Sequence, residues 1–348
     1  MSRWGADKVV SKGRELRPFM LMVETTSGQR RDTARAVIDA SGTWQTPNPL
    51  GVGGLSAEGE SEFRDRIGYG IPDVLGRDRD LYAGRTTLVA GAGHSAANAL
   101  LELANLSESA PDTSAIWTTR STDLVRIYGG GDADALPARG ELGSEVKDLA
   151  ESGRVRLVTG FATTAIREVG GRLLVDGQTK DGVLTIGPVD RIIAATGQRP
   201  DLVLTRELRL DLDPWLESVK ALGPLIDPNE HSCGDVPPHG HRELSHPEPG
   251  FYTVGIKSYG RAPTFLLLTG YEQVRSVAAA IAGDMAAADA VQLVLPETGV
   301  CTVPASFSGS ASKGCCGGPA AEAVDACCVA DAQAKEGGKA GCGCSAAA

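Results

Sequence analysis

The sequence predicts an α/β fold in which a nucleotide-binding domain is inserted into a second domain. An apolar strand at 86–90 leads into a glycine-rich turn and then a helix, the arrangement that binds a dinucleotide pyrophosphate. Two further apolar strands, one before and one after this motif, end at a small hydroxylic residue followed by glycine. The segment between them alternates strand and helix patterns, which indicates a parallel sheet.

The glycine-rich turn reads Gly91-x-Gly93-x-x-Ala96. Its first glycine allows a tight turn, its second lets the backbone approach the phosphates, and its small third residue lets the helix pack closely on the strand. The helix N-terminus supplies free N–H groups and a positive dipole. His94 lies where it could contact the cofactor, and a solvent-facing histidine is the alternative. An ordinary strand-to-helix turn is the alternative for the whole motif.

The flanking strands favour the nucleotide interpretation. In the stretch at 36–43 the apolar run stops at Ser41-Gly42. In the stretch at 191–197 it stops at Thr196-Gly197. Such an ending lets the chain leave a sheet beside a bound cofactor without a side chain in the way. Two of them around a nucleotide motif indicate an inserted domain.

The predicted elements divide the chain into four segments. Residues 1–84 hold a strand at 19–24, a polar turn at 26–29, the strand ending at Gly42 and a Pro/Gly-rich link at 47–54. Residues 85–188 hold strands at 86–90, 115–119 and 154–160, helices at 95–106 and 143–152, and an antiparallel meander at 165–169, 172–175 and 183–186. Residues 189–304 return to the outer domain with strands at 191–197 and 251–255 and a helix at 264–282. Residues 305–348 form a tail.

The residue after the second strand of the inserted domain indicates which dinucleotide binds. In NAD-specific sites an acidic side chain about 20 residues beyond the glycines holds the ribose hydroxyls. Here that strand ends in Arg120, and a guanidinium at this point suits the 2′-phosphate of NADPH. The alternative is an arginine that faces water.

Composition excludes several classes of protein. The 348 residues, 42% of them hydrophobic, suffice for two domains with cores. A net charge of −10 without a basic cluster argues against nucleic acid or an anionic membrane as the partner, so a small molecule is expected. The N-terminus lacks a signal-peptide core, and no apolar run approaches the roughly 18 residues that span a bilayer. A cytoplasmic location is therefore expected, and the oligomeric state is not predicted.

The tail is rich in glycine, alanine and serine and is predicted to be disordered. It holds six of the eight cysteines: Cys315, Cys316, Cys327, Cys328, Cys342 and Cys344. Adjacent thiols close poorly on each other as disulfides, whereas a mobile chain can gather two or three of them around one soft ion. The spacing fits zinc poorly, so trivalent arsenic, mercury or copper(I) is the expected ion. Inert thiols in a solvated tail are the alternative.

Together these motifs resemble the two-dinucleotide-binding flavoproteins. The stretches ASGTW, GAGHSA, ATGQRPDL and GFYTVGIKSYGRAPTFLLLTGYEQV are similar to flavin-containing monooxygenases and thioredoxin-reductase-like enzymes, and most of all to bacterial flavoproteins associated with arsenic resistance. The resemblance covers about residues 8–303. It implies a Rossmann-like NADPH domain, a parallel sheet plus an antiparallel meander, nested in an FAD-binding α/β domain. In this class NADPH delivers hydride to the flavin, which then activates oxygen or passes electrons to an acceptor.

The resemblance also implies roles for individual residues. It assigns Gly91, Gly93, Ser95 and Ala96 to NADPH and places Ser41-Gly42 and Thr196-Gly197 at hinge strands near the flavin. A helix beginning at Thr264 would aim its N-terminus at the flavin, where reduced flavin carries negative charge. Lys257 and Arg261 could add to that stabilisation, and solvated loop charges are the alternative.

Three departures from the family pattern stand out. No FAD fingerprint precedes Arg14, so the FAD domain is expected to be incomplete, with apolar strands near 20–23 and 37–40 exposed and their edges free. The family's Gly-Asp beside the flavin is replaced by Gly255-Ile256-Lys257. The monooxygenase fingerprint F-x-G-x-x-x-H is absent from the region of Tyr69-Gly70. No catalytic residue is assigned.

Three hypotheses follow. The first is an NADPH-dependent, monooxygenase-like flavin oxidoreductase in arsenic or metalloid resistance, with a tail that captures the thiophilic species. The second is a flavin-dependent metal or disulfide reductase that uses the tail thiols. The third is a non-catalytic metalloid-binding protein whose body no longer holds FAD.

Overall fold

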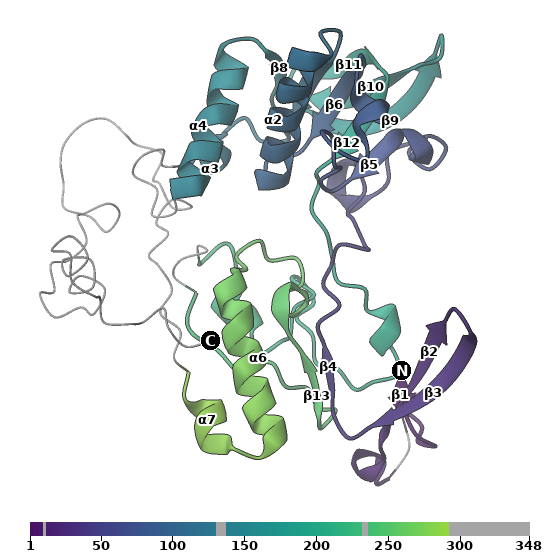
Figure 1. The fold of residues 1–348 in the computed structure, drawn as a ribbon, viewed down its shortest axis with the longest axis vertical. Helices are drawn as coiled ribbons and strands as arrows, with labels where there is room; N and C mark the ends of the chain where they lie inside the picture. The colour runs from purple at the N-terminus through teal and green to yellow at the C-terminus, as the bar shows by residue number, and fades with distance from the viewer. Residues whose placement is uncertain (10–11, 130–136, 232–235, 292–348) are drawn as a thin grey trace, which may run out of the picture. The chain divides into compact units, whose positions relative to one another are not determined.

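The computed structural model describes residues 1–9, 12–129, 137–231 and 236–291 of the chain. The chain separates into one unit at 1–307 and another at 308–348. The second unit lies outside the described residues, and so do all eight cysteines, including the six of the predicted ion-binding tail. The first unit confirms the predicted α/β fold class (Figure 1).

A five-stranded parallel sheet forms the centre of the part of the chain that contains the glycine-rich turn. Its order is β5 (Ile67–Tyr69), β12 (Arg191–Ala194), β6 (Thr86–Ala90), β7 (Ser114–Thr118) and β8 (Val155–Val158). Helices α2 (His94–Ser109) and α4 (Pro137–Glu151) share one core with this sheet, as do residues of α1 (Arg79–Tyr82) and α3 (Val125–Tyr128) (Figure 1). The inner strands β12, β6 and β7 are apolar because both faces of the sheet are covered there.

The second face of this sheet packs against the predicted antiparallel meander. The meander consists of β9 (Ala162–Val169), β10 (Arg172–Thr179) and β11 (Gly182–Val189). Successive strand residues point to opposite faces. Val89 of β6 therefore packs in the helical core, whereas its neighbour Leu88 packs in the core that includes Val175 and Ile186 of the meander.

The remaining described residues build two smaller sheets and a helical layer. β1 (Ser2–Arg3), β2 (Phe19–Thr25) and β3 (Gly28–Ala34) are antiparallel, while β4 (Val37–Asp39) pairs with β13 (Phe251–Thr253) in parallel. The helices here are α5 (Gly223–Ile226), α6 (Leu267–Ala282) and α7 (Met285–Asp289). Short 3-10 helices complete the chain: η1 (Arg14–Leu16), η2 (Val52–Gly54), η3 (Arg64–Arg66), η5 (Val203–Thr205) and η6 (Gly255–Tyr259).

The strand at 191–194 differs from its predicted place in the outer domain. It pairs in parallel with β5 on one side and β6 on the other. The sequence shows that β12 is a buried strand but not which strand it pairs with, because parallel partners are distant in the chain. The five-stranded sheet therefore draws strands from both sides of the predicted 85–188 segment.

The predicted free edge at residues 20–23 is wrong. β2 lies between β1 and β3, and the polar strand β3 was not predicted from the sequence. β4 has one partner strand, β13, within the described part of the chain, and Ile38 is 38% exposed there. Among the described residues no helix is long and apolar enough to cross a membrane.

Candidate functional site

The two glycines of the turn after β6 differ in what surrounds them. Gly91 has φ 147°, and a Cβ at this position would lie closer than 3.0 Å to the carbonyl oxygen of Ala195. Gly93 differs, because no protein atom lies within 4 Å of its Cβ position. The first glycine is thus required by the protein's own backbone, and the second leaves an open approach to the turn.

The N-terminus of α2 adjoins that opening. Gly93 is the N-cap residue in extended conformation, and no side chain caps the helix. The N–H groups of Ala96 and Ala97 donate to the Gly93 carbonyl oxygen, and buried Ala96 lets the helix pack on the sheet. His94 is exposed and Ser95 is half-buried. A helix end without a capping side chain leaves N–H donors for an anionic ligand.

A buried tryptophan that the sequence analysis missed holds the turn. The indole N–H of Trp117 in β7 donates to the Gly91 carbonyl oxygen at 2.8 Å, and the Gly91 N–H donates to the Thr118 carbonyl oxygen at 3.0 Å. Trp117 is fully buried. A buried indole N–H needs an acceptor, so a tryptophan in the strand beside the turn was the available signal.

Arg120 emerges at the same edge of the sheet as the turn. Ala90 of β6 is paired with Thr118 of β7, so Arg120 follows two residues beyond that pair. Thr119 between them is buried and its N–H donates to the Val158 carbonyl oxygen, whereas Arg120 is exposed. Its guanidinium forms no ion pair within the described part of the chain, which leaves it available for a phosphate.

The structure brings Ser41 and Lys257 together. The Lys257 ammonium donates to Asp39 Oδ2 at 2.8 Å and to Ser41 Oγ at 2.9 Å, and Ser41 Oγ donates to Asp39 Oδ1 at 2.7 Å. Lys257 is 3% exposed and Asp39 is 7% exposed. Lys257 is therefore neither a solvated charge nor a free cation, since its ammonium binds the chain's own carboxylate at the carboxyl ends of β4 and β13.

The two glycines beside this ion pair have backbone conformations that favour glycine. Gly42 has φ 72° and Gly255 has φ 68°, and nothing lies within 4 Å of the Cβ position at Gly255. The Gly255 N–H donates to Gln273 Oε1 at 2.7 Å, which ties the end of β13 to α6. The helix begins at Leu267, three residues later than predicted.

Thr196 and Gly197 bind a different segment from Ser41 and Gly42. Thr196 Oγ1 donates to the Asn48 carbonyl oxygen at 2.7 Å, and the Asn48 N–H donates to the Gly197 carbonyl oxygen at 2.9 Å. The Thr43 hydroxyl also bonds Gln198 Oε1 at 3.1 Å. The segments that follow the two predicted strand ends thus run side by side.

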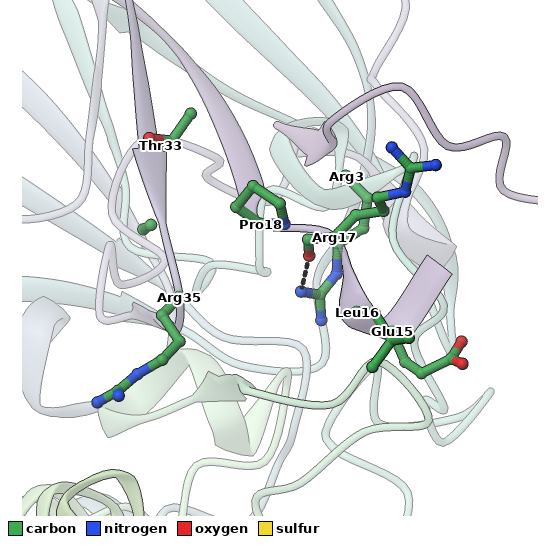
Figure 2. Close-up of a pocket in the computed structure, with 8 residues that line it drawn as sticks. Arg3, Glu15, Leu16, Arg17, Pro18, Thr33 and Arg35 are labelled. Atoms are coloured by element: carbon green, nitrogen blue, oxygen red, sulfur yellow. Dashed lines mark hydrogen bonds between the residues drawn. The ribbon is translucent and has the colours of Figure 1, made fainter. Parts of the chain in front are cut away.

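A cavity of about 270 Å³ lies against the β1–β2–β3 sheet (Figure 2), and no predicted cofactor residue lines it. Arg3 is buried there, and its guanidinium is committed to the Arg17 carbonyl oxygen at 2.6 Å and to Glu248 at 2.8 Å. Figure 2 shows the Arg35 side chain directed away from Arg3 and Arg17. The arginines of this cavity therefore do not converge on one point.

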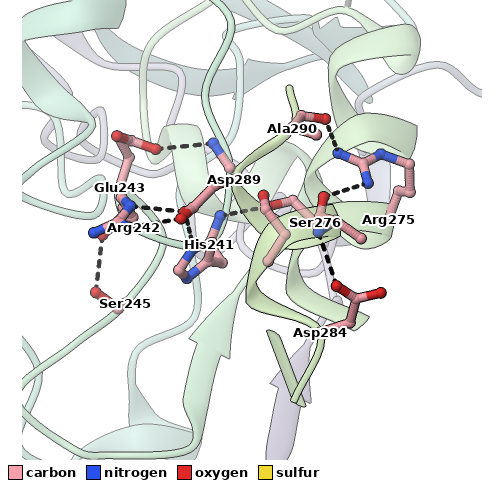
Figure 3. A network of polar contacts seen from close by, with 12 residues as sticks. His241, Arg242, Glu243, Ser245, Arg275, Ser276, Asp284, Asp289 and Ala290 are labelled. Atoms are coloured by element: carbon pink, nitrogen blue, oxygen red, sulfur yellow. Dashed lines mark hydrogen bonds and ion pairs between the residues drawn. The ribbon is translucent and has the colours of Figure 1, made fainter. Parts of the chain in front are cut away.

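His241 and Arg242 tie the loop before β13 to the C-terminal end of α7. His241 Nε2 lies 2.8 Å from Asp289 Oδ1, and Arg242 binds the same carboxylate through two nitrogens (Figure 3). Hydrogen bonding to Arg242, then to His241, holds the pKa of Asp289 well below its usual range. Ser276 of α6 accepts the His241 N–H and donates to the Ala288 carbonyl oxygen, which fixes α7. Among the described residues no group of three metal-ligating side chains occurs.

The described fold is similar to two solved bacillithiol disulfide reductases. The Bdr (YpdA) enzyme of Bacillus cereus matches with a TM-score of 0.54 and 16% identity, and that of Staphylococcus aureus with 0.51 and 15%. Each match covers 76% of this chain and 67% of the reductase chain. No family model and no curated protein matches the sequence. Identities this low establish the fold alone, an α/β fold like that of these two reductases.

Proposed function

We propose that the chain is an NADPH-dependent oxidoreductase. The observation that carries this proposal is the open backbone at Gly93 beside the uncapped N-terminus of α2, with Arg120 at the same carboxyl edge of the sheet. Dinucleotides bind at such an edge, and a guanidinium suits the 2′-phosphate. Gly93, Ser95 and the α2 N-terminus would hold the pyrophosphate, and NADPH bound there supplies a hydride.

FAD is proposed as the second cofactor. The carboxyl ends of β4 and β13 are parallel and adjacent, and Gly255 presents backbone with an empty Cβ position beside α6. The fold similarity to disulfide reductases also favours a flavoprotein. Lys257 would favour reduced flavin indirectly. Its ammonium offsets the negative charge of Asp39 at this edge, which would otherwise repel the negative charge of reduced flavin.

The identity of the electron acceptor is proposed from the sequence. Six tail cysteines would capture a thiophilic ion such as trivalent arsenic, and the protein would act in metalloid handling by monooxygenase-like chemistry. The alternative, a metal or disulfide reductase that uses these thiols, gains support from the fold similarity to bacillithiol disulfide reductases. A non-catalytic metalloid-binding protein is the third reading.

Calorimetric titration with NADPH and with NADH tests the nucleotide site. We expect NADPH to bind more tightly, and Arg120→Ala to weaken NADPH about tenfold while leaving NADH unchanged. Arg31→Ala, at an exposed arginine of β3, is the matched control and should change neither affinity. If the wild type binds the two nucleotides equally, Arg120 does not recognise the 2′-phosphate. If it binds neither nucleotide, the proposed nucleotide site is wrong.

Spectroscopy and turnover test the finer proposals separately. A flavin absorbance that co-purifies with the protein, or that appears after FAD is added, excludes the non-catalytic reading. With FAD present, stimulation of NADPH oxidation by a trivalent arsenical supports the metalloid hypothesis, and its absence at full flavin occupancy contradicts it. Loss of turnover with retained flavin reduction, after all six tail cysteines are replaced by serine, marks the thiol-dependent reductase.

A further inference from the structure

A second cavity lies at the carboxyl end of β5, on the same edge of the sheet as the glycine-rich turn. Its volume is about 260 Å³, just below the roughly 300–1,000 Å³ of drug-sized ligand sites. Two prolines, Pro47 and Pro49, form part of its wall. The polar residues that line it are Ser56, Glu60, Ser61, Arg64 and Tyr69.

Glu60 belongs to the protein's interior rather than to a ligand. Its carboxylate accepts the Leu50 N–H at 2.8 Å, the Ala57 N–H at 2.7 Å and the Tyr69 hydroxyl at 2.6 Å, and the residue is 3% exposed. Burial, together with the hydrogen bond to Glu60, raises the pKa of Tyr69 to about 12. Tyr69 therefore stays neutral and keeps donating to Glu60, so the carboxylate has three donors of its own.

Arg64 is the charged group that this arrangement leaves for a ligand. Its guanidinium carbon lies 4.1 Å from the centroid of the Tyr69 ring. A guanidinium stacked on an aromatic ring directs most of its N–H groups outward in its own plane, where they can bind a carboxylate through two parallel hydrogen bonds. Arg64 is exposed and forms no ion pair within the described residues.

Two hydroxyl groups add to this donor set. Ser56 and Ser61 line the same cavity, and within the described part of the chain neither hydroxyl has a hydrogen-bond partner. A serine hydroxyl can donate to an anion. The cavity thus combines a guanidinium that contacts the Tyr69 side chain but has no ion pair among the described residues, two hydroxyls without a hydrogen-bond partner there, and the rings of Pro47, Pro49 and Tyr69.

From this combination we infer that the cavity binds a small organic carboxylic acid in its ionised form. Arg64 holds the carboxylate through two N–H groups, Ser56 and Ser61 supply further donors, and the proline rings contact the organic part. The inference goes beyond the proposed function, because it assigns a second ligand that does not depend on NADPH or FAD.

Benzoate is a suitable probe, because it joins a carboxylate to a flat apolar ring. Saturation-transfer difference NMR of the full chain with sodium benzoate should show binding, and inorganic phosphate at constant ionic strength should displace it. Arg64→Gln should weaken benzoate about tenfold, Arg64→Lys less, and Ser61→Ala about twofold to threefold. Arg31→Gln, a matched surface arginine, should bind as the wild type does.

The inference fails if the wild type shows no saturation transfer to benzoate. It also fails if neutral benzamide binds as tightly as benzoate, because the site would then recognise the ring and not the charge. If Arg64→Gln and Arg31→Gln bind benzoate with equal affinity, benzoate does not bind at Arg64 and the inference is wrong. Thermal melting of each variant checks that the fold is retained, and NADPH titration shows independently whether the nucleotide site is intact.

Discussion

The indole N–H of Trp117 and the carbonyl oxygen of Gly91 form a 2.8 Å hydrogen bond that joins two neighbouring strands at the candidate nucleotide site. β7 binds both backbone polar groups of Gly91, because the Gly91 N–H also donates to the Thr118 carbonyl oxygen. The protein's own hydrogen bonds therefore hold this turn. A preformed site loses less conformational freedom on binding and so retains more of its contact energy as affinity.

Trp117→Phe should weaken NADPH binding about twofold to tenfold, because a hydrogen bond contributes about 0.5–1.5 kcal/mol and its loss releases the turn. Calorimetric titration measures the change. Trp215→Phe is the control, since Trp215 is 83% exposed and lies in another part of the chain. An unchanged affinity in Trp117→Phe would show that backbone contacts alone position the turn.

The two glycines of the turn should respond differently to alanine. Gly91→Ala should lower the free energy of unfolding by more than about 2 kcal/mol, because its Cβ would collide with the Ala195 backbone. Gly93→Ala should fold as stably as the wild type, since its Cβ meets no protein atom, yet bind NADPH at least about tenfold more weakly because that Cβ occupies the phosphate approach. Urea denaturation and nucleotide titration of both variants measure these effects, and normal NADPH binding by Gly93→Ala would contradict the site.

Lys257→Met should destabilise the chain by about 3–5 kcal/mol, because it leaves the Asp39 carboxylate buried without its cation. Replacing both partners, as Asp39→Asn with Lys257→Met, should recover much of this loss. Lys220→Met is the matched control, because the Lys220–Asp211 pair is exposed and should contribute less than about 1 kcal/mol. Urea denaturation of the four proteins compares them, and a loss in Lys257→Met no larger than in the control would show that the buried pair is not required.

His246 should make the protein less stable in mild acid. Burial lowers its pKa from 6.5 to about 4, while its Nδ1 accepts the Asp211 N–H and its Nε2 bonds the Thr253 hydroxyl. Between pH 6.5 and 4 the unfolded chain binds a proton that the folded chain does not, so stability falls as the pH falls through this range, by about 3 kcal/mol in total. Urea denaturation across this range should show a shallower dependence in His246→Gln than in the wild type, and an equal slope in the two proteins would contradict the prediction.

Local patterns in the sequence were sufficient for most of the elements. The strand at Thr86–Ala90 was predicted with the bounds that the structure has, because an apolar run followed by a glycine turn is a local signal. The partners of β12 and the strand β3 were not predicted. Pairing is decided by residues far away in the chain, and β3 is too polar to stand out as a strand.

The candidate site shows the same division. The glycine turn and Arg120 could be identified from spacing alone. Lys257 was recognised as a departure from the family pattern, but its partner Asp39 is more than 200 residues away in the chain, and only the folded structure shows the ion pair. Trp117 was read as part of a strand, since nothing local reveals that its indole faces the turn.

The contacts of Glu60 fix the length of the segment that precedes it. The sequence suggests that the Pro/Gly-rich stretch at 47–54 is a spacer, and spacers tolerate insertions and deletions. Here the Leu50 and Ala57 N–H groups both donate to the Glu60 carboxylate. Adding or removing a residue between them would break one of these hydrogen bonds and leave the buried carboxylate with one donor fewer. Related chains that keep this loop should therefore vary in its side chains but not in its residue count.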